Sequence, residues 1–436
     1  MSMHKKVVKL AAPSVVNMLL LTVISYTDTF VISRFGADAV SGSSIVMAVW
    51  GLLYAITALF SSGEQVLLTR FVGAKSYKKA SIVISTLVIS AIVVSVVLAV
   101  VFYYLPTMIL TLLDTSKSVI EYAIAYGYIL VLDIPFIFTN TVIDTALISY
   151  GNTKMPMYLA IVAAVLNVIL DFGLGFGYFG LPNMGVVGVA LSTVISYVVV
   201  ALLHLYLFFG NKMPYGANIR FSMSVLKRVL KISIPQVSSR FITVLSNILF
   251  GSAIITLGSK VYAGYSLALS AMSIAYMPGF AFASAGSILL GQEIGAKSYA
   301  NAKKFVEIAF RYAFVVLVGV GAFFWVFAKE VAEVFSSDPE VITVMVLSIR
   351  VFALAQIPFA FDIVYTFAIN GAGLTKKSFK INILTLWIFR IIPAMVGIYI
   401  LHSYYVVLGS FLAQLIAAGY FMFREFYKYR WVRLKV

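Results

Sequence analysis

The octapeptide GAKSYKKA at residues 73–80 recurs 222 residues later as GAKSYANA at residues 295–302. Other segments match at the same offset: Lys9-Leu-Ala-Ala-Pro13 with Lys231-Ile-Ser-Ile-Pro235, Gly42 with Gly264, and Gly151-Asn-Thr-Lys154 with Gly373-Leu-Thr-Lys376. Chance accounts for one recurring basic loop, but not for several matches in nearly constant register. The sequence therefore predicts an internal duplication, in which the two octapeptides are the same loop in two halves.

The composition indicates the environment of both halves. Hydrophobic residues make up 62% of the chain and charged residues 11%, with a mean hydropathy of +1.02. Soluble domains carry about 25% charged residues. Apolar stretches such as 81–101 are long enough to cross a ~30 Å hydrocarbon core and lack the alternation of barrel strands. We therefore expect an all-α polytopic membrane protein embedded in the lipid bilayer.

Hydropathy, together with the polar loop residues that separate the apolar stretches, predicts about twelve transmembrane helices, which form two sets of six. We place them near 10–33, 43–68, 80–104, 118–148, 155–177, 184–209, 228–256, 262–290, 303–328, 341–370, 378–401 and 404–426. We expect two pseudo-symmetric six-helix lobes at residues 1–209 and 228–436, joined by a cytoplasmic linker at 210–227. Because six is an even number, both halves enter the membrane from the same side, and such parallel repeats are typical of transporters with alternating access.

The positive charges indicate the orientation. Most of the 32 Lys and Arg fall in loops that the predicted spans place on one side, among them Lys75, Lys154 and Lys377. Loops rich in Lys and Arg stay cytoplasmic, so we expect a multi-pass protein of the cell membrane with both termini cytoplasmic. Nucleic-acid binding is the competing explanation for the net charge of +16. It is disfavoured because these charges are spread over several short loops and not gathered in one domain.

Several chemistries are disfavoured by what the chain lacks. It has no cysteine, and its three histidines (His4, His204 and His402) show no ligand spacing, so we expect no disulfide, metal centre or cofactor. No loop is long enough for a catalytic region and no His/Ser/Asp grouping recurs, so an enzyme is not expected. A channel stays open as an alternative, although a channel would not need two halves of different chemistry.

The two halves differ in acidic residues inside the predicted spans. Asp28 of the first span corresponds to Phe250 in the second half. Asn167 and Asp171 of the fifth span lie four residues apart, on one helix face, and their counterparts are apolar. A carboxylate inside the membrane costs roughly 2.5–3.5 kcal/mol, so such residues face the protein interior and usually serve a function. Asp28, Asn167 and Asp171 therefore form a candidate site for a coupling cation or proton. The alternative is a hydrogen-bonded pair with one carboxyl permanently protonated.

Two further polar positions and a proline are candidate functional residues. Asp362 aligns with Asn140 across the duplication, and both are candidate substrate or C-lobe polar contacts. Asp362 could instead form a structural ion pair with one of the arginines in the second half. Pro13 is expected at the start of the first span, where proline is tolerated, and it becomes a candidate bend point if it lies deeper.

These features together resemble the multidrug and toxic compound extrusion (MATE) family over essentially the whole chain. The resemblance rests on the order and spacing of Lys9-Leu-Ala-Ala-Pro13 followed by Asp28, Arg70-Phe-Val-Gly-Ala-Lys75, Gly151-Asn-Thr-Lys154-Met-Pro156, Asn167-Val-Ile-Leu-Asp171 and Gly185-Val-Val-Gly-Val-Ala-Leu-Ser-Thr193. It implies a monomeric exporter of amphipathic, often cationic organic compounds, driven by inward H⁺ or Na⁺. A flippase for lipid-linked precursors, from the same superfamily, is the alternative.

The resemblance also implies which residues carry the coupling. In the DinF-like branch the ion site resembles an N-lobe set made of Asp28, Asn167, Asp171, Thr193 and the main-chain oxygen of Val189. Ion binding in that branch is linked to bending of the first helix at the position of Pro13. The NorM-like branch has an additional acid in the seventh span, where this chain has Thr243, and this difference favours the DinF-like branch.

Overall fold

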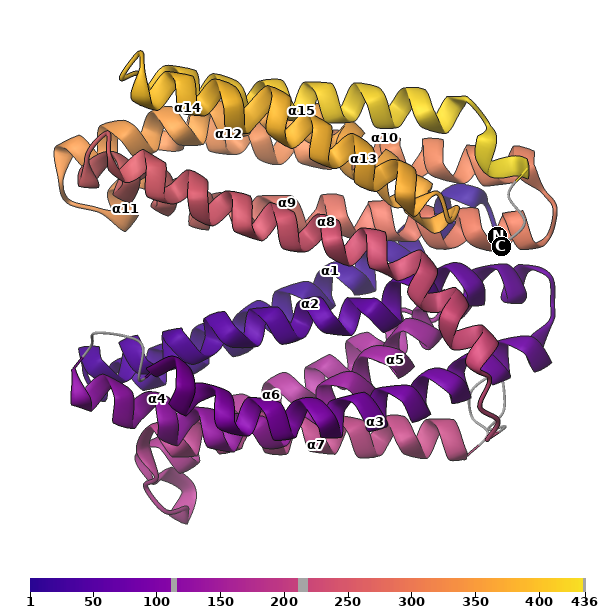
Figure 1. Cartoon of the computed structure of the whole chain (residues 1–436), viewed down its shortest axis with the longest axis horizontal. Helices are drawn as coiled ribbons and strands as arrows, with labels where there is room; N and C mark the ends of the chain where they lie inside the picture. Colours follow the sequence, from indigo (N-terminus) through magenta and orange to yellow (C-terminus); the bar gives the residue numbers. More distant parts are fainter. Residues whose placement is uncertain (111–115, 211–218, 434–436) are drawn as a thin grey trace. The chain divides into compact units, whose positions relative to one another are not determined.

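The structure is a computed structural model that describes residues 1–110, 116–210 and 219–433 (Figure 1). Twelve helices in this described part are long and apolar enough to cross a membrane. The spans are α1 (Met3–Ser33), α2 (Ala37–Gly73), α3 (Tyr77–Leu110), α4–η1–α5 (Lys117–Leu130, Val131–Asp133, Ile134–Tyr150), α6 (Lys154–Phe176), α7 (Gly185–Phe209), α8 (Met223–Ile255), α9 (Ser259–Gly295), α10 (Tyr299–Val326), α12 (Pro339–Gly371), α13–η3–α14 (Thr375–Thr385, Leu386–Ile391, Ile392–Tyr399) and α15 (Tyr404–Tyr427). Each predicted span has its helix, so the all-α fold class is confirmed.

Short helical pieces complete the chain. The helix α11 (Ala328–Phe335) and the 3-10 turns η2 (Tyr178–Gly180) and η4 (Arg430–Arg433) lie between or after the spans. Helices suit these apolar segments because a helix satisfies its own backbone hydrogen bonds, which the hydrocarbon core cannot do.

The duplicated octapeptides fold into the same turn. Lys75 and Lys297 both adopt a left-handed backbone, with φ of 53° and 60°. The amide of Ser76 donates to the carbonyl of Phe71 and the amide of Ser298 to that of Glu293, both at 2.8 Å. Identical turn geometry at the two copies supports the duplication that the sequence predicts.

The chain divides into two compact units. The first unit is Pro13–Ser233, and the second unit is Met1–Ala12 together with Ile234–Val436. α1 and α8 each contribute to both units, and the division falls at Pro13 in α1 and next to Pro235 in α8.

The position of Pro13 differs from the sequence prediction, and Pro235 of the second half is placed in the same way. Both lie inside their helices rather than at the first turn. The sequence placed the helix starts too late because the preceding residues are basic, and hydropathy does not count a basic turn as helix. A proline inside a helix removes a backbone hydrogen bond, so both positions are potential bend points.

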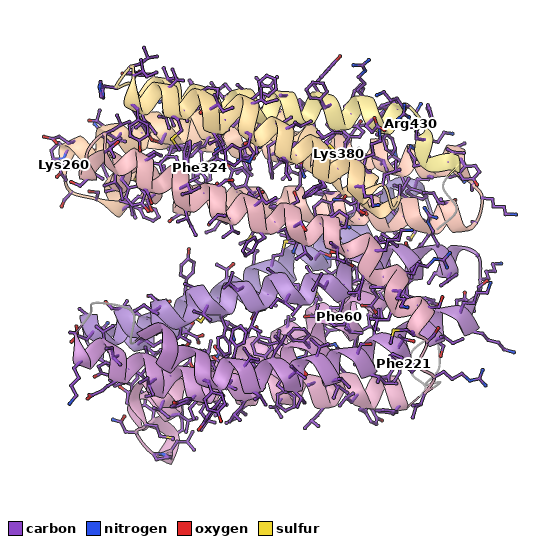
Figure 2. All side chains as sticks on the ribbon, in the orientation of Figure 1. Phe60, Phe221, Lys260, Phe324, Lys380 and Arg430 are labelled. Atoms are coloured by element: carbon purple, nitrogen blue, oxygen red, sulfur yellow. The ribbon has the colours of Figure 1, made fainter. Side chains whose placement is uncertain are left out.

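In the first unit, α2 packs against α4 and α5, α3 packs against α5, and α6 packs against α7. Phe60 on α2, labelled in Figure 2, makes an edge-to-face contact with Phe138 on α5 at 5.9 Å between ring centres. α6 and α7 approach closely at Gly188, where an added Cβ would stand 2.4 Å from the Leu174 carbonyl oxygen. Only glycine allows this approach, which brings the polar faces of α6 and α7 together.

In the second unit, α9, α10, α12 and α15 lie side by side (Figure 1). Lys260 lies at one end of this unit, whereas Lys380 and Arg430 lie at the other (Figure 2). This separation agrees with the predicted spans, which place the loop between 228–256 and 262–290 on the opposite side of the membrane from the segment after 404–426.

Candidate cation-coupling site

The structure brings the five predicted coupling residues together within the first unit. Asp28 lies on α1, Asn167 and Asp171 on α6, and Val189 and Thr193 on α7. Asn167, Asp171 and Val189 are fully buried, and Asp28 is 9% exposed. The spacing of four residues on α6 places Asn167 and Asp171 on the face that the Gly188 contact presses against α7.

Asn167 is at the centre of the hydrogen bonds in this site. Its side-chain amide lies 3.3 Å from Oδ1 of Asp28 and 3.4 Å from the hydroxyls of Ser192 and Thr193. Thr193 donates to Oδ2 of Asp28 at 3.4 Å or to the Val189 carbonyl at 3.3 Å. These contacts join α1, α6 and α7 through one buried polar cluster.

Asp28 and Asp171 lie within hydrogen-bonding reach of each other. Two carboxyl groups can share a hydrogen bond only if one of them holds a proton, because an ionised carboxylate only accepts. Two buried oxygens at the site, Oδ1 of Asn167 and Oδ2 of Asp171, have no hydrogen-bond partner. The cluster can therefore hold a shared proton, and its carboxyl, amide and hydroxyl oxygens are also the donor types that hard cations prefer.

Sequence reasoning missed Ser192. This fully buried residue hydrogen-bonds to Asp171 and also approaches the Val189 carbonyl at 2.8 Å. Its helical spacing from Val189 is a signal that could have identified it, because residues three and four apart share a face.

A group of buried or half-buried tyrosines next to the site was also missed. The buried Asp133 is close enough to interact electrostatically with Tyr54, Tyr197 and Tyr126. Tyr126 also interacts with Asp28 and Asp171. The polar region thus extends beyond the five predicted residues, into α2, α4 and η1.

The other two polar candidates do not join the cluster. Asn140 on α5 binds the His204 ring and the Tyr197 carbonyl. Asp362 on α12, in the second unit, accepts a hydrogen bond from Thr366 at 3.1 Å. Within the residues that the structure describes, Asp362 has no arginine ion-pair partner, contrary to the structural alternative raised from the sequence.

No Lys or Arg of the described residues forms an ion pair with Asp28 or Asp171 (the described ion pairs lie elsewhere). Arg390, a buried basic residue of the second unit in the π-helical segment η3, is held by aromatic rings. Its guanidinium lies 4.7 Å from the centre of the Phe250 ring and 5.0 Å from that of Phe411. No fixed cation therefore neutralises the acidic pair, which leaves it available to an exchangeable one.

Twelve apolar helices, a sequence duplication and a buried acidic pair without an arginine partner define a polytopic membrane protein of the transporter class. A family model described as MatE matches residues 13–172 and 235–396. The two matched segments begin at Pro13 and Pro235, and together they cover most of the chain. The chain belongs to the MatE family, whose members are transporters and not enzymes.

Named relatives and solved structures agree with this membership. A protein of Thermotoga maritima named probable multidrug resistance protein NorM is 24% identical, over 90% of this chain and 85% of its own length. The probable multidrug resistance protein YoeA of Bacillus subtilis is 25% identical, over 81% of this chain and 77% of its own.

The fold resembles that of solved structures along its whole length. A multidrug resistance MATE family transporter of the MOP superfamily, in an outward-facing conformation, matches with a TM-score of 0.92 and 20% identity, over 100% of this chain and 98% of that chain. A MOP superfamily transporter from Pyrococcus furiosus matches with a TM-score of 0.91, also at 20% identity and over the same shares of the two chains. The MATE fold predicted from the sequence is confirmed.

Proposed function

We propose that this chain is a multidrug efflux transporter that exports amphipathic, often cationic organic compounds in exchange for H⁺ or Na⁺. Membership of the MatE family supports export, and the multidrug names of the relatives support the substrate class. The observation that carries the coupling is the buried cluster of Asp28, Asn167 and Asp171 among apolar helices, with oxygens left unpartnered.

The site can take either ion. A proton would bind between the Asp28 and Asp171 carboxyls, which already lie within hydrogen-bonding reach. A sodium ion would take its ligands from the carboxylates, the unpartnered amide oxygen of Asn167, the Thr193 hydroxyl and the Val189 carbonyl. Both ions would reduce the cost of keeping two carboxylates away from water, so occupancy would stabilise the arrangement of α1 against α6 and α7.

The bend of α1 at Pro13 would transmit this occupancy. Asp28 and Pro13 lie on the same helix, about 22 Å apart along its axis at 1.5 Å per residue. Because Pro13 cannot donate a backbone hydrogen bond, the helix is weakest there. Contacts that draw the Asp28 segment toward α6 would therefore change the angle of α1 at Pro13 and not elsewhere.

The remaining predictions about assembly belong to the same proposal. We propose that the protein is a monomer in the cell membrane with both termini cytoplasmic, and that its lobes are 1–209 and 228–436 with a linker at 210–227. The absence of an acid at Thr243 supports the DinF-like branch. Asp362 is the proposed polar contact of the C-lobe, while the Asn140 amide is already engaged within the first unit.

The decisive experiment is transport by purified protein in lipid vesicles, with a fluorescent cationic dye as the probe. A pH gradient alone and a sodium gradient alone are imposed in turn, which identifies the coupling ion. Asp28→Asn and Asp171→Asn should each abolish ion-driven export while the protein still folds and inserts. Asp38→Asn, which changes an exposed acid on α2, is the matched control and should leave export unchanged. Normal export by both site variants would refute the assignment.

A further inference from the structure

A second buried titratable group lies in the first unit, outside the coupling site. His204 on α7 is fully buried, and its two ring nitrogens contact two side chains of α5. Nδ1 lies 2.9 Å from Oδ1 of Asn140, and Nε2 lies 3.0 Å from Oδ1 of Asp144. The side chain of Asp144 is 33% exposed, so this small cluster connects the interior of the unit to its surface.

The hydrogen bonds around Asn140 determine which ring nitrogen carries a proton. The Asn140 amide nitrogen donates to the Tyr197 carbonyl at 3.1 Å. A carbonyl only accepts, so the amide nitrogen must face Tyr197 and the amide oxygen must face His204. That oxygen also only accepts, and therefore Nδ1 of His204 carries a hydrogen.

With this assignment, a neutral His204 ring has no hydrogen between its Nε2 and the Asp144 carboxylate. In the neutral ring with hydrogen on Nδ1, Nε2 presents a lone pair. A lone pair and an ionised carboxylate repel each other at 3.0 Å. The observed contact becomes favourable when one proton lies between them, either on the imidazole or on Asp144.

Nothing else on the neighbouring helices supplies that positive charge. α7 packs against α4, η1, α5 and α6. On η1, Asp133 interacts electrostatically with Tyr197, which precedes His204 by about two helical turns, and on α4 Tyr126 interacts with Asp133. In the described part of the chain, His204 is the one basic group that pairs with Asp144.

α6 is the remaining helix that packs against α7. Its basic residue, Lys154, is the first residue of the helix. The contacts of Leu174 with Gly188 and of Asp171 with Ser192 set α6 and α7 antiparallel. The start of α6, with Lys154 and Tyr158, therefore lies toward the His204 end of α7. Both of these side chains belong to the first turns of α6, close to the aqueous phase.

We propose that the His204–Asp144 pair is a second proton-binding site, which passes protons between the Asp28/Asp171 pair and the water on the basic side of the unit. His204 follows Thr193 by about 16 Å along α7. Tyr197 lies between them on α7, and its main-chain carbonyl accepts a hydrogen bond from the Asn140 amide that also contacts the His204 ring. Because the His204–Asp144 pair already holds one proton, a proton taken up by the imidazole would be balanced by the proton that Asp144 releases from its exposed side. This inference rests on the H⁺ form of the proposed function.

Nitrogen NMR tests the bound proton without any transport. The chain contains three histidines, so ¹⁵N-histidine labelling in a bilayer gives few signals, and His204→Gln identifies the signal of interest. We expect Nδ1 to be protonated and Nε2 to be protonated or strongly hydrogen-bonded near neutral pH. Asp144→Asn should convert the ring to an ordinary neutral imidazole. A signal of an unprotonated Nε2 without a hydrogen bond would overturn the proposal.

Vesicle transport tests the relay. His204→Gln should slow proton-driven dye exchange about tenfold or more, while dye binding stays unchanged. Imidazole added to the vesicle lumen should restore part of the rate, which a purely structural role would not allow. His402→Gln, in an exposed loop, is the matched control and should behave as wild type.

The outcomes separate the two proposals. A wild-type rate in His204→Gln, or a slowing that imidazole does not relieve, would overturn the relay alone. A wild-type protein that exchanges nothing against protons would overturn the relay together with the H⁺ form of the proposed function.

Discussion

Replacement of Gly188 by alanine tests whether the geometry of the coupling site, and not only its charge, drives transport. The added Cβ would stand 2.4 Å from the Leu174 carbonyl oxygen, whereas ordinary contact begins at 3.4 Å. α6 and α7 would therefore have to separate by roughly 1 Å, with a stability cost of about 1–3 kcal/mol. The variant should still fold, because alanine favours the helix over glycine by about 1 kcal/mol.

Moving α6 away from α7 would lengthen hydrogen bonds that are already long. Asn167 reaches Ser192 and Thr193 from α6 to α7 at 3.4 Å each. A further ~1 Å would break both bonds, since hydrogen bonds beyond about 3.5 Å are lost. Misplacement of reacting groups by 1 Å costs about 100-fold in enzymes, and we expect a loss of that order in ion-driven dye export.

The assay is dye export from vesicles under the gradient that drives the wild-type protein, with dye binding and thermal melting measured in parallel. Gly51→Ala on α2 is the control, because no atom lies within 4 Å of its added Cβ. It should export as wild type does. If Gly188→Ala also exported at the wild-type rate, the α6–α7 contact would not position the site, and the geometric argument would be refuted.

Two further predictions concern single hydrogen bonds. Ser192→Ala should raise the ion concentration for half-maximal export about tenfold or more, because a hydrogen bond to a charged group contributes about 1.5–3 kcal/mol. Ser196→Ala is the control and should leave this concentration unchanged, because the Ser196 hydroxyl donates to a main-chain oxygen. Outside the membrane, the hydrogen bond from Lys260 lowers the pKa of Asp338. This pair therefore stabilises the folded protein above the ordinary aspartate pKa and loses the effect as pH falls through the lowered value. Melting temperatures of wild type and Asp338→Asn should thus converge in acid, and a constant difference across pH would contradict this.

The sequence predicted the elements that depend on composition and spacing. Twelve apolar stretches became twelve helices because the hydrocarbon core permits little else. The turn at Lys75 and Lys297 was identified by repetition alone. Asp28, Asn167 and Asp171 were identified because an acid in one half faced an apolar counterpart in the other, and the spacing of four residues placed two of them on one face.

The missed features depend on which helices pack together. Ser192 and Tyr197 are ordinary residues of an apolar span until the Gly188 contact places α7 against α6. His204 was set aside because histidines far apart in sequence do not form a metal site, although one histidine between two polar side chains of α5 can hold a proton. The late start given to α1 has a related cause, since hydropathy measures affinity for lipid and not the extent of a helix.

The duplication itself supports the proposal that one half carries the coupling. At the position of Asp28 the second half has Phe250, whose ring lies against the buried Arg390. Arg390 replaces Val168 of the first half, next to Asn167. At this position the first unit has the oxygens of the proposed cation site. The second unit instead has the permanently charged guanidinium of Arg390, which lies between aromatic rings. A tethered guanidinium cannot be released, and this supports the proposal that ion exchange takes place in the first unit.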